Sequence, residues 1–118
     1  MSVTPEDLAR TLLARERSRR EHNARRAEQL RRALSSWAAA AKASGLVGRA
    51  WMLGSLARGD WGDASDVDVA VEGLAPNCEA STWSGLEALL SSSVDLLRVE
   101  SLPRSFAERI RAEGIELP

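Results

Sequence analysis

The sequence predicts a mixed α/β (α+β) fold, in which a small mixed β-sheet is flanked by helices and preceded by one long N-terminal helix. Between Pro5 and Gly45 there is neither glycine nor proline, which favours an uninterrupted helix. After Gly45, short apolar runs alternate with turn residues, a texture typical of strands that alternate with helices. A length of 118 residues with 28% charged side chains fits one globular domain rather than two.

The N-terminal helix has a clear start signal. Thr4 is a good N-cap residue, Pro5 suits the first helical turn, and acidic residues follow directly. Further along, apolar residues recur at spacings of three and four, so this half of the helix is expected to press one face onto a core. These residues are Ala27, Leu30, Leu34, Trp37 and Ala41.

The first half of this helix has little to bury, because residues 15–23 contain no apolar side chain. A continuous helix from Pro5 to Ser44 would be about 60 Å long, against a diameter of about 35 Å for a compact domain of this size. We therefore expect the helix either to break near His22 and Asn23 or to project its first half beyond the domain.

The rest of the chain predicts strands and helices in alternation. Residues 54–65 form a loop with room for a helical turn, and residues 66–71 have the period of two of a half-buried strand. The expected strands are residues 49–53, 66–71 and 94–99, and the expected helices are residues 81–90 and 103–113. The first of these helices offers four large side chains to the core: Trp83, Leu86, Leu89 and Leu90.

The net charge of −1 hides two parts of opposite sign. Residues 1–44 hold ten Lys or Arg against five Asp or Glu, and residues 45–118 hold six against twelve, so a basic arm precedes an acidic body. For the arginine-rich segment 15–26, three interpretations are open: a solvated helix held by its own ion pairs, a docking surface for a partner or a second copy, and a nucleic-acid contact. The interleaved glutamates argue against nucleic acid. Three apolar residues nearby favour docking: Leu8, Leu12 and Leu13.

Residue counts exclude several classes of protein. The single cysteine, Cys78, excludes an internal disulfide framework. The single histidine, His22, leaves too few parts for a histidine-dependent catalytic triad or a multi-histidine zinc site. No segment approaches the roughly 20 apolar residues of a membrane span. We expect no membrane partner and a cytoplasmic location.

Three acids carry the clearest chemical signal. Residues two apart on a strand share a face, so Asp66 and Asp68 are expected to hold two carboxylates side by side. Asp95 places a third acid in the next expected strand. Such acids repel one another unless cations neutralise them, and carboxylate oxygens with open positions suit Mg²⁺ bound together with phosphates. The three acids therefore predict a two-metal site.

Gly54 and Ser55 directly follow the first expected strand. A glycine lets the backbone approach a ligand closely, and Ser55 with the free N–H groups of a helical turn is suited to phosphate oxygens. Arg58, four residues after Gly54, also suits a phosphate contact. Ser65 either caps the loop or touches a ligand, and both interpretations are open.

Together these residues resemble the minimal nucleotidyltransferase family, within the nucleotidyltransferase superfamily that includes DNA polymerase beta. The family's pattern, Gly-Ser-x-Ala-Arg-Gly followed by Ser-Asp-x-Asp, appears here at residues 54–59 and 65–68. Residues 94–96 and 108–114 also look like that family. The resemblance covers residues 28–118, which we take as the nucleotidyltransferase domain, and leaves residues 1–27 as an arginine-rich helical extension.

The resemblance implies a nucleotidyltransferase fold and transfer of AMP from ATP, or of another nucleotide from its triphosphate, to a hydroxyl. It assigns the nucleotide to Gly54, Ser55, Arg58 and Ser65, and two Mg²⁺ ions to Asp66, Asp68 and Asp95. Asp95 would also help to deprotonate or place the acceptor hydroxyl.

Family members are often encoded beside a helical HEPN-domain toxin, so the resemblance also implies an antitoxin whose acceptor is such a protein. The chain has no tyrosine, and a tyrosine acceptor would therefore belong to another protein. Two alternatives are open: a non-catalytic antitoxin that only covers its partner, and a nucleotidyltransferase that acts on a small molecule. A homo-oligomer formed through the N-terminal helix is a further expectation.

Overall fold

The structure is a computed structural model that describes residues 2–118. In chain order its elements are α1 (Pro5–Ala43), β1 (Arg49–Leu53), α2 (Gly54–Arg58), β2 (Val67–Glu72), the 3₁₀ helix η1 (Pro76–Cys78), α3 (Glu79–Leu90), β3 (Val94–Arg98), the 3₁₀ helix η2 (Val99–Ser101), α4 (Arg104–Glu113) and β4 (Ile115–Glu116). The predicted α/β class with a long N-terminal helix is confirmed.

The described strands form one mixed sheet in the order β3-β2-β1-β4. β1 runs antiparallel to both β2 and β4, whereas β2 and β3 are parallel. Parallel neighbours need a long crossover, and α3 supplies it between β2 and β3. The three predicted strands lie within one residue of their observed bounds.

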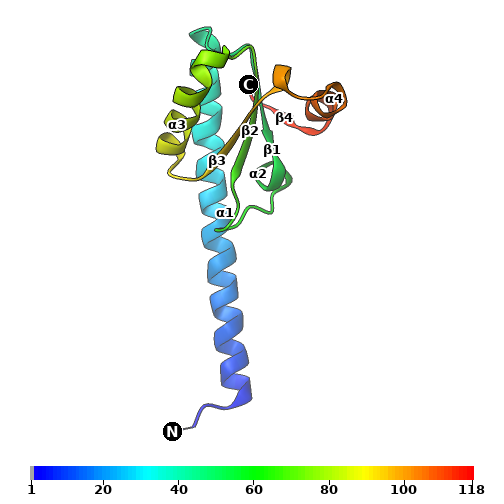
Figure 1. Ribbon diagram of the computed structural model, residues 1–118. Coiled ribbons are helices and arrows are strands. Elements are labelled where there is room, and N and C mark those ends of the chain that lie inside the picture. Colours follow the sequence, from blue (N-terminus) through cyan, green and yellow to red (C-terminus); the bar gives the residue numbers. More distant parts are fainter. Residues whose placement is uncertain (1) are drawn as a thin grey trace.

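The sheet is covered on both faces, as the layers in Figure 1 show. α1 and α3 pack on one face, where alternate residues of β2 and β3 enter the main core: Val67, Val69, Val71, Val94 and Leu96. α4 covers the other face through Ala107 and Ile110, which pack against Trp51 and Ala70. α4 leaves one end of this second face open, and the candidate site lies there.

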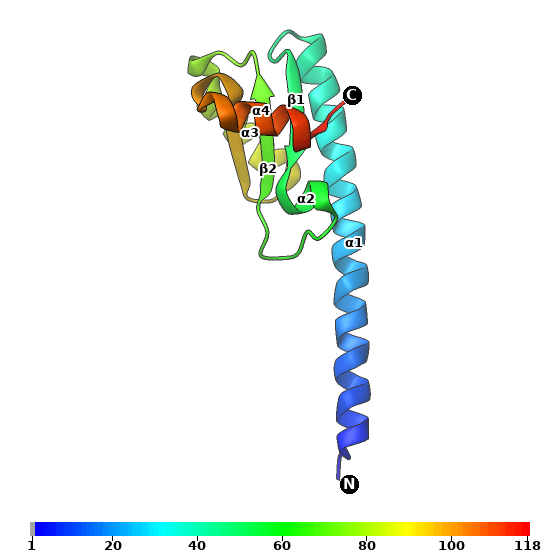
Figure 2. The same ribbon diagram turned by 90° about the vertical axis from the view of Figure 1, so that its right-hand side faces the viewer.

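α1 is one uninterrupted helix whose first half projects from the domain (Figures 1 and 2). Of the two expected outcomes, projection rather than a break near His22 and Asn23 is the one observed. The described chain measures 64 Å along its longest axis and has a radius of gyration of 18.2 Å, against about 13 Å for a compact domain of this length. The helix is buried only in its second half, at Ala27, Leu30, Leu34, Ala38 and Ala41.

Two details differ from the sequence prediction. Leu89 is exposed rather than buried, because α3 directs Thr82, Leu86 and Leu90 inward at four-residue spacing and leaves Leu89 at the edge. β4 was not predicted, since two residues are too few to show an alternating pattern. A Cβ atom at Gly114 would lie 2.7 Å from the Ile110 carbonyl oxygen, so the chain can turn this closely from α4 onto β1 only with glycine.

Across residues 2–118, no helix combines the length and apolar character needed to cross a bilayer.

Candidate active site

Two of the three predicted acids face one another across parallel strands. Asp68 in β2 is in register with Asp95 in β3. Asp66 lies just before β2 and is exposed, as is Asp95, whereas Asp68 is half-buried. Two residues further along each strand, Ala70 and Leu97 belong to the α4 side of the sheet. Asp68 and Asp95 therefore lie at the end of the sheet face that α4 leaves open.

The environment of Asp68 disfavours its charge. Burial is the largest cause of a raised pKa at this carboxyl, followed by repulsion from the charges of Asp95 and Asp66. A hydrogen bond between the Asp68 and Asp95 side chains raises the pKa of Asp68 further, and the nearby Arg58 guanidinium opposes the shift only weakly. The three acids thus form a region of negative charge that would attract a cation.

Gly54 brings the backbone directly against this carboxyl. Its φ angle is +63°, in the left-handed region, and a Cβ atom built there would lie 2.2 Å from Oδ2 of Asp68. β1 and β2 explain the approach, because Leu53, the residue before Gly54, is in register with Asp68. The sequence prediction of a close backbone approach at Gly54 thus has a specific partner, the Asp68 side chain.

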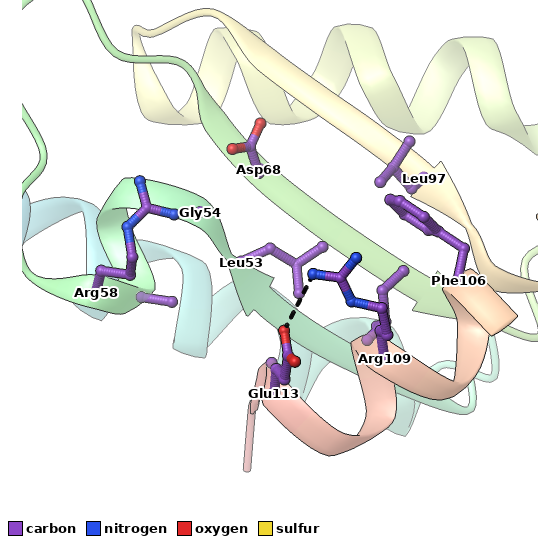
Figure 3. Close-up of a pocket in the computed structure, with 11 residues that line it drawn as sticks. Leu53, Gly54, Arg58, Asp68, Leu97, Phe106, Arg109 and Glu113 are labelled. Atoms are coloured by element: carbon purple, nitrogen blue, oxygen red, sulfur yellow. Dashed lines mark ion pairs between the residues drawn. The ribbon is translucent and has the colours of Figure 1, made fainter.

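A pocket of about 430 Å³ opens beside Asp68 (Figure 3). One wall comes from the β1–α2 turn and includes Gly54 and Arg58, and the opposite wall comes from α4 and β3. Asp68 is the predicted acid that lines it. The α4 and β3 side chains are Leu97, Phe106, Arg109, Ile110 and Glu113.

The other predicted nucleotide-binding residues lie at different distances from this pocket. Ser55 is half-buried in α2, next to Gly54. Arg58 lines the pocket with a largely exposed side chain, and its Nε lies 3.6 Å from Oδ1 of Asp60. Ser65 closes a tight turn, in which its Oγ accepts a hydrogen bond from the Gly62 N–H at 3.1 Å. Ser65 and Asp66 line a second cavity next to α1 rather than the pocket of Asp68.

Residues 39–118 match the family model described as Polymerase beta, Nucleotidyltransferase. The chain belongs to this nucleotidyltransferase family. The matched residues include β1, α2, β2 and β3, and thus every predicted site residue.

A solved structure supports the same assignment. It carries the provisional description of a minimal nucleotidyltransferase, and it is similar to this chain with a TM-score of 0.65 and 29% sequence identity over 75% of this chain and 93% of that one. No match was found among the curated proteins compared. The resemblance to minimal nucleotidyltransferases and the nucleotidyltransferase fold are therefore confirmed. The boundary between residues 1–27 and 28–118 stays a prediction, although Arg26 of the extension already donates a hydrogen bond to the Leu90 carbonyl oxygen.

The acids of this nucleotidyltransferase offer the oxygen ligands that a hard cation prefers, although they do not surround a cation on all sides. Carboxylate oxygens are the preferred ligands of Mg²⁺, and repulsion from Asp95 and Asp66 adds to burial in raising the pKa of Asp68. Within the described residues, no three His, Cys, Asp or Glu side chains converge closely enough to form a metal cage. An open set suits Mg²⁺, because this ion keeps several waters and takes further ligands from substrate phosphates.

Sequence reasoning missed the contribution of α4 to the nucleotidyltransferase pocket. Phe106, Arg109 and Glu113 line it, yet none lies in the glycine-serine or aspartate motif. Their spacing of three and four residues places them on one helix face, and that spacing is the signal from which they could have been found. Arg109 and Glu113 form an ion pair at 3.6 Å, marked in Figure 3.

Proposed function

We propose that this protein is an Mg²⁺-dependent nucleotidyltransferase that transfers AMP from ATP to a hydroxyl of another protein. One observation carries the proposal: Asp68 is in register with Asp95, has a raised pKa caused by burial and by its acidic neighbours, and lies against the Gly54 backbone. Carboxylates that repel one another in this way do not stabilise a strand. They are useful in a site that binds cations together with phosphates.

In this proposal, the acids bind the metal and the residues of the β1–α2 turn bind the phosphates. Asp66 and Asp68, with Asp95, would hold the metal, and Gly54, Ser55 and Arg58 would hold the phosphates beside it. When bound, Mg²⁺ supplies charge neutralisation and orientation of the triphosphate. Ser65 orders the loop that leads into Asp66, through its hydrogen bond with Gly62, and we propose that it acts on the nucleotide through that loop.

The transfer itself requires little covalent chemistry from the protein. The acceptor oxygen forms a bond to the α-phosphorus of ATP, the bond from that phosphorus to the bridging oxygen breaks, and pyrophosphate leaves. Asp95 is exposed at the rim and takes the hydroxyl proton or orients the hydroxyl. Positioning and charge neutralisation provide most of the rate enhancement in such reactions.

The proposed acceptor is a hydroxyl of a small helical protein of the HEPN toxin type, which this chain would neutralise. The family resemblance and the open pocket support this choice, since an open site admits a side chain presented by a partner. If the accepting hydroxyl belongs to a tyrosine, that tyrosine lies in another protein, because this chain has none.

The test incubates the protein with ATP, Mg²⁺ and the helical protein encoded by the neighbouring gene, and follows the intact mass of that acceptor. We expect the mass of one or more AMP units to be added, with the gain lost in the double variant Asp66→Asn, Asp68→Asn. Asp63→Asn is the matched control, because Asp63 is an exposed acid of the same loop and lies outside the pocket.

Two outcomes would favour other functions. If the acceptor gains no mass and the double variant still neutralises the toxin, the protein is a non-catalytic antitoxin. If AMP is transferred to an aminoglycoside-like compound with no partner present, the acceptor is a small molecule.

A further inference from the structure

The pocket beside Asp68 has an apolar end, away from Gly54 and Arg58, which are the residues proposed to hold the phosphates. In Figure 3, Gly54 and Arg58 lie at one end of the pocket, and Leu97 and Phe106 lie at the other. The volume of about 430 Å³ falls within the range of about 300–1,000 Å³ that is usual for sites of small organic molecules. The apolar end therefore has room for a part of the substrate other than its phosphates.

Phe106 is held at this end without a partner in the core. α4 packs on the sheet through Ala107 and Ile110, and Phe106 is not a member of that buried cluster. Its side chain is 46% exposed although it is the single phenylalanine of the chain. Leaving an aromatic ring in water forfeits burial free energy, and a ligand that covers the ring recovers it.

We propose that Phe106 and Leu97 form the nucleoside subsite, in which the base of the nucleotide stacks on the Phe106 ring. This inference rests on the proposed function, because the phosphates beside Gly54 and Asp68 set the direction in which the nucleoside extends. A strand advances about 3.3 Å per residue, so Leu97 lies about 7 Å beyond Asp95 on the same face. A nucleoside linked to a phosphate at the acids therefore extends toward Leu97 and Phe106.

The rim of the subsite carries hydrogen-bonding groups that suit the edge of a base. Nη2 of Arg109 lies 3.6 Å from Oε2 of Glu113, and both side chains are about 70% exposed, so each keeps free hydrogen-bonding capacity. The pair presents N–H donors beside carboxylate acceptors. An adenine edge carries the complementary set, an amino donor and ring-nitrogen acceptors.

The test separates the base from the phosphates by using two ligands. α,β-Methylene-ATP has a base and resists cleavage at the α–β bond, whereas tripolyphosphate has no base. Calorimetric titration with Mg²⁺ present measures the affinity of each for the wild type, Phe106→Ala and Phe106→Trp. Leu89→Ala is the matched control, because Leu89 is an exposed apolar residue of α3 outside the pocket.

We expect Phe106→Ala to lower the affinity for α,β-methylene-ATP about tenfold, because the base loses its stacking partner. The affinity for tripolyphosphate, which has no base, should stay within about twofold of the wild-type value. Phe106→Trp, which keeps an aromatic ring, and Leu89→Ala should both bind the two ligands with the affinity of the wild type. Thermal unfolding of each variant shows whether it is folded, and the exposure of Phe106 predicts that it is.

The possible failures are distinguishable. If the wild type binds the nucleotide and Phe106→Ala binds it equally well, the nucleoside subsite is wrong and the proposed function stands. If Phe106→Ala weakens both ligands equally, Phe106 acts on the fold rather than on the base, and the subsite is again wrong. If the wild type binds neither ligand with Mg²⁺, the proposed function fails, and the subsite fails with it.

Discussion

At Gly54, a backbone constraint and a site constraint coincide. Its φ of +63° is unfavourable for any residue with a Cβ atom, and the space where that atom would lie is filled by the Asp68 carboxyl. Gly59 has a similar φ of +88°, but nothing lies within 4 Å of its Cβ position. The two glycines therefore separate backbone strain from displacement of Asp68.

We expect Gly54→Ala and Gly59→Ala each to lower the free energy of unfolding by about 1–2 kcal/mol, because both place alanine at a positive φ. Nucleotide transfer should fall more than tenfold in Gly54→Ala only, since only there is the Asp68 carboxyl pushed aside. Urea unfolding and transfer rates measured on the same preparations test this. Equal activity in the two variants would contradict the proposed contact between the Gly54 turn and the catalytic acid.

Asp68 is predicted to oppose folding at neutral pH when no divalent cation is present. Its pKa is raised above the ordinary value of 3.8, so the folded state disfavours the ionised form. Asp68 therefore weakens stability progressively as the pH rises from about 3.8 through the raised pKa, and the loss is complete above that pKa.

Asp68→Asn should accordingly raise the free energy of unfolding near pH 7, by an amount that solvent screening of this partly exposed carboxyl keeps small. The gain should vanish below about pH 3.8, where Asp68 is protonated in both states. Chemical unfolding in chelator-containing buffer across this pH range measures it, with Asp63→Asn as the control. A variant that is less stable than the wild type at pH 7 would contradict the prediction.

The sequence predicts which acids belong to the site, but it does not predict the contacts around them. Strand periodicity predicts that Asp66 and Asp68 share a face, whereas β2 begins at Val67, so Asp66 lies just before the strand and lines the second cavity next to α1. The pairing of Asp68 with Asp95 depends on strand order and register, which no local pattern contains. Phe106 was missed because an aromatic residue in a helix usually belongs to the core, and only the packing of Ala107 and Ile110 shows that α4 turns another face to the sheet.

Among the elements, α1 differs in burial along its length: its second half packs in the core and its first half is exposed to solvent. Leu30 is fully buried against the sheet, whereas Leu12 is 53% exposed on the projecting part. We expect Leu30→Ala to lower the free energy of unfolding by about 2–5 kcal/mol, because it leaves a cavity in the core. Leu12→Ala should change it by less than about 0.5 kcal/mol.

Denaturant unfolding of these two variants is a matched comparison, since the same substitution is made in the same helix. A large loss of stability in Leu12→Ala would show that the projecting half is buried against something in solution, such as a second copy of the chain. Comparison of the unfolding midpoint at two protein concentrations would then identify self-association.

Element boundaries followed from local sequence wherever an apolar run was long enough to use. β1 to β3 are five or six residues long and were placed within one residue of their observed bounds. β4 has two residues, and its position is set by the turn at Gly114 and by the hydrogen bond from the Leu117 N–H to the Ala50 carbonyl oxygen. These are tertiary contacts, so periodicity could not predict them.

At the scale of the whole molecule, length alone showed that α1 and the domain do not match in size. The sequence could not decide between a broken and a projecting helix, because that choice depends on what α1 packs against. In the structure, the uninterrupted helix formers and ion pairs such as Glu16 with Arg19 at 2.6 Å keep the exposed half helical. The projecting arm, residues 2–17, is thereby separated in space from the acidic body (Figure 2).

This separation predicts that the projecting arm, residues 2–17, is dispensable for the fold and for the site. Residues 2–17 contribute no buried side chain, and the contacts of α1 with the body begin near His22 and Asn23.

A chain shortened to begin at Ser18 keeps a residue suited to cap the new helix start. Its unfolding midpoint should lie within about 2 °C of the full-length value, since lost surface residues change stability little. Circular dichroism should show less helix, and α,β-methylene-ATP should bind unchanged. If the shortened chain loses both stability and nucleotide binding, the arm is part of the domain; if it keeps both and no longer associates with the helical partner, the arm is the docking surface.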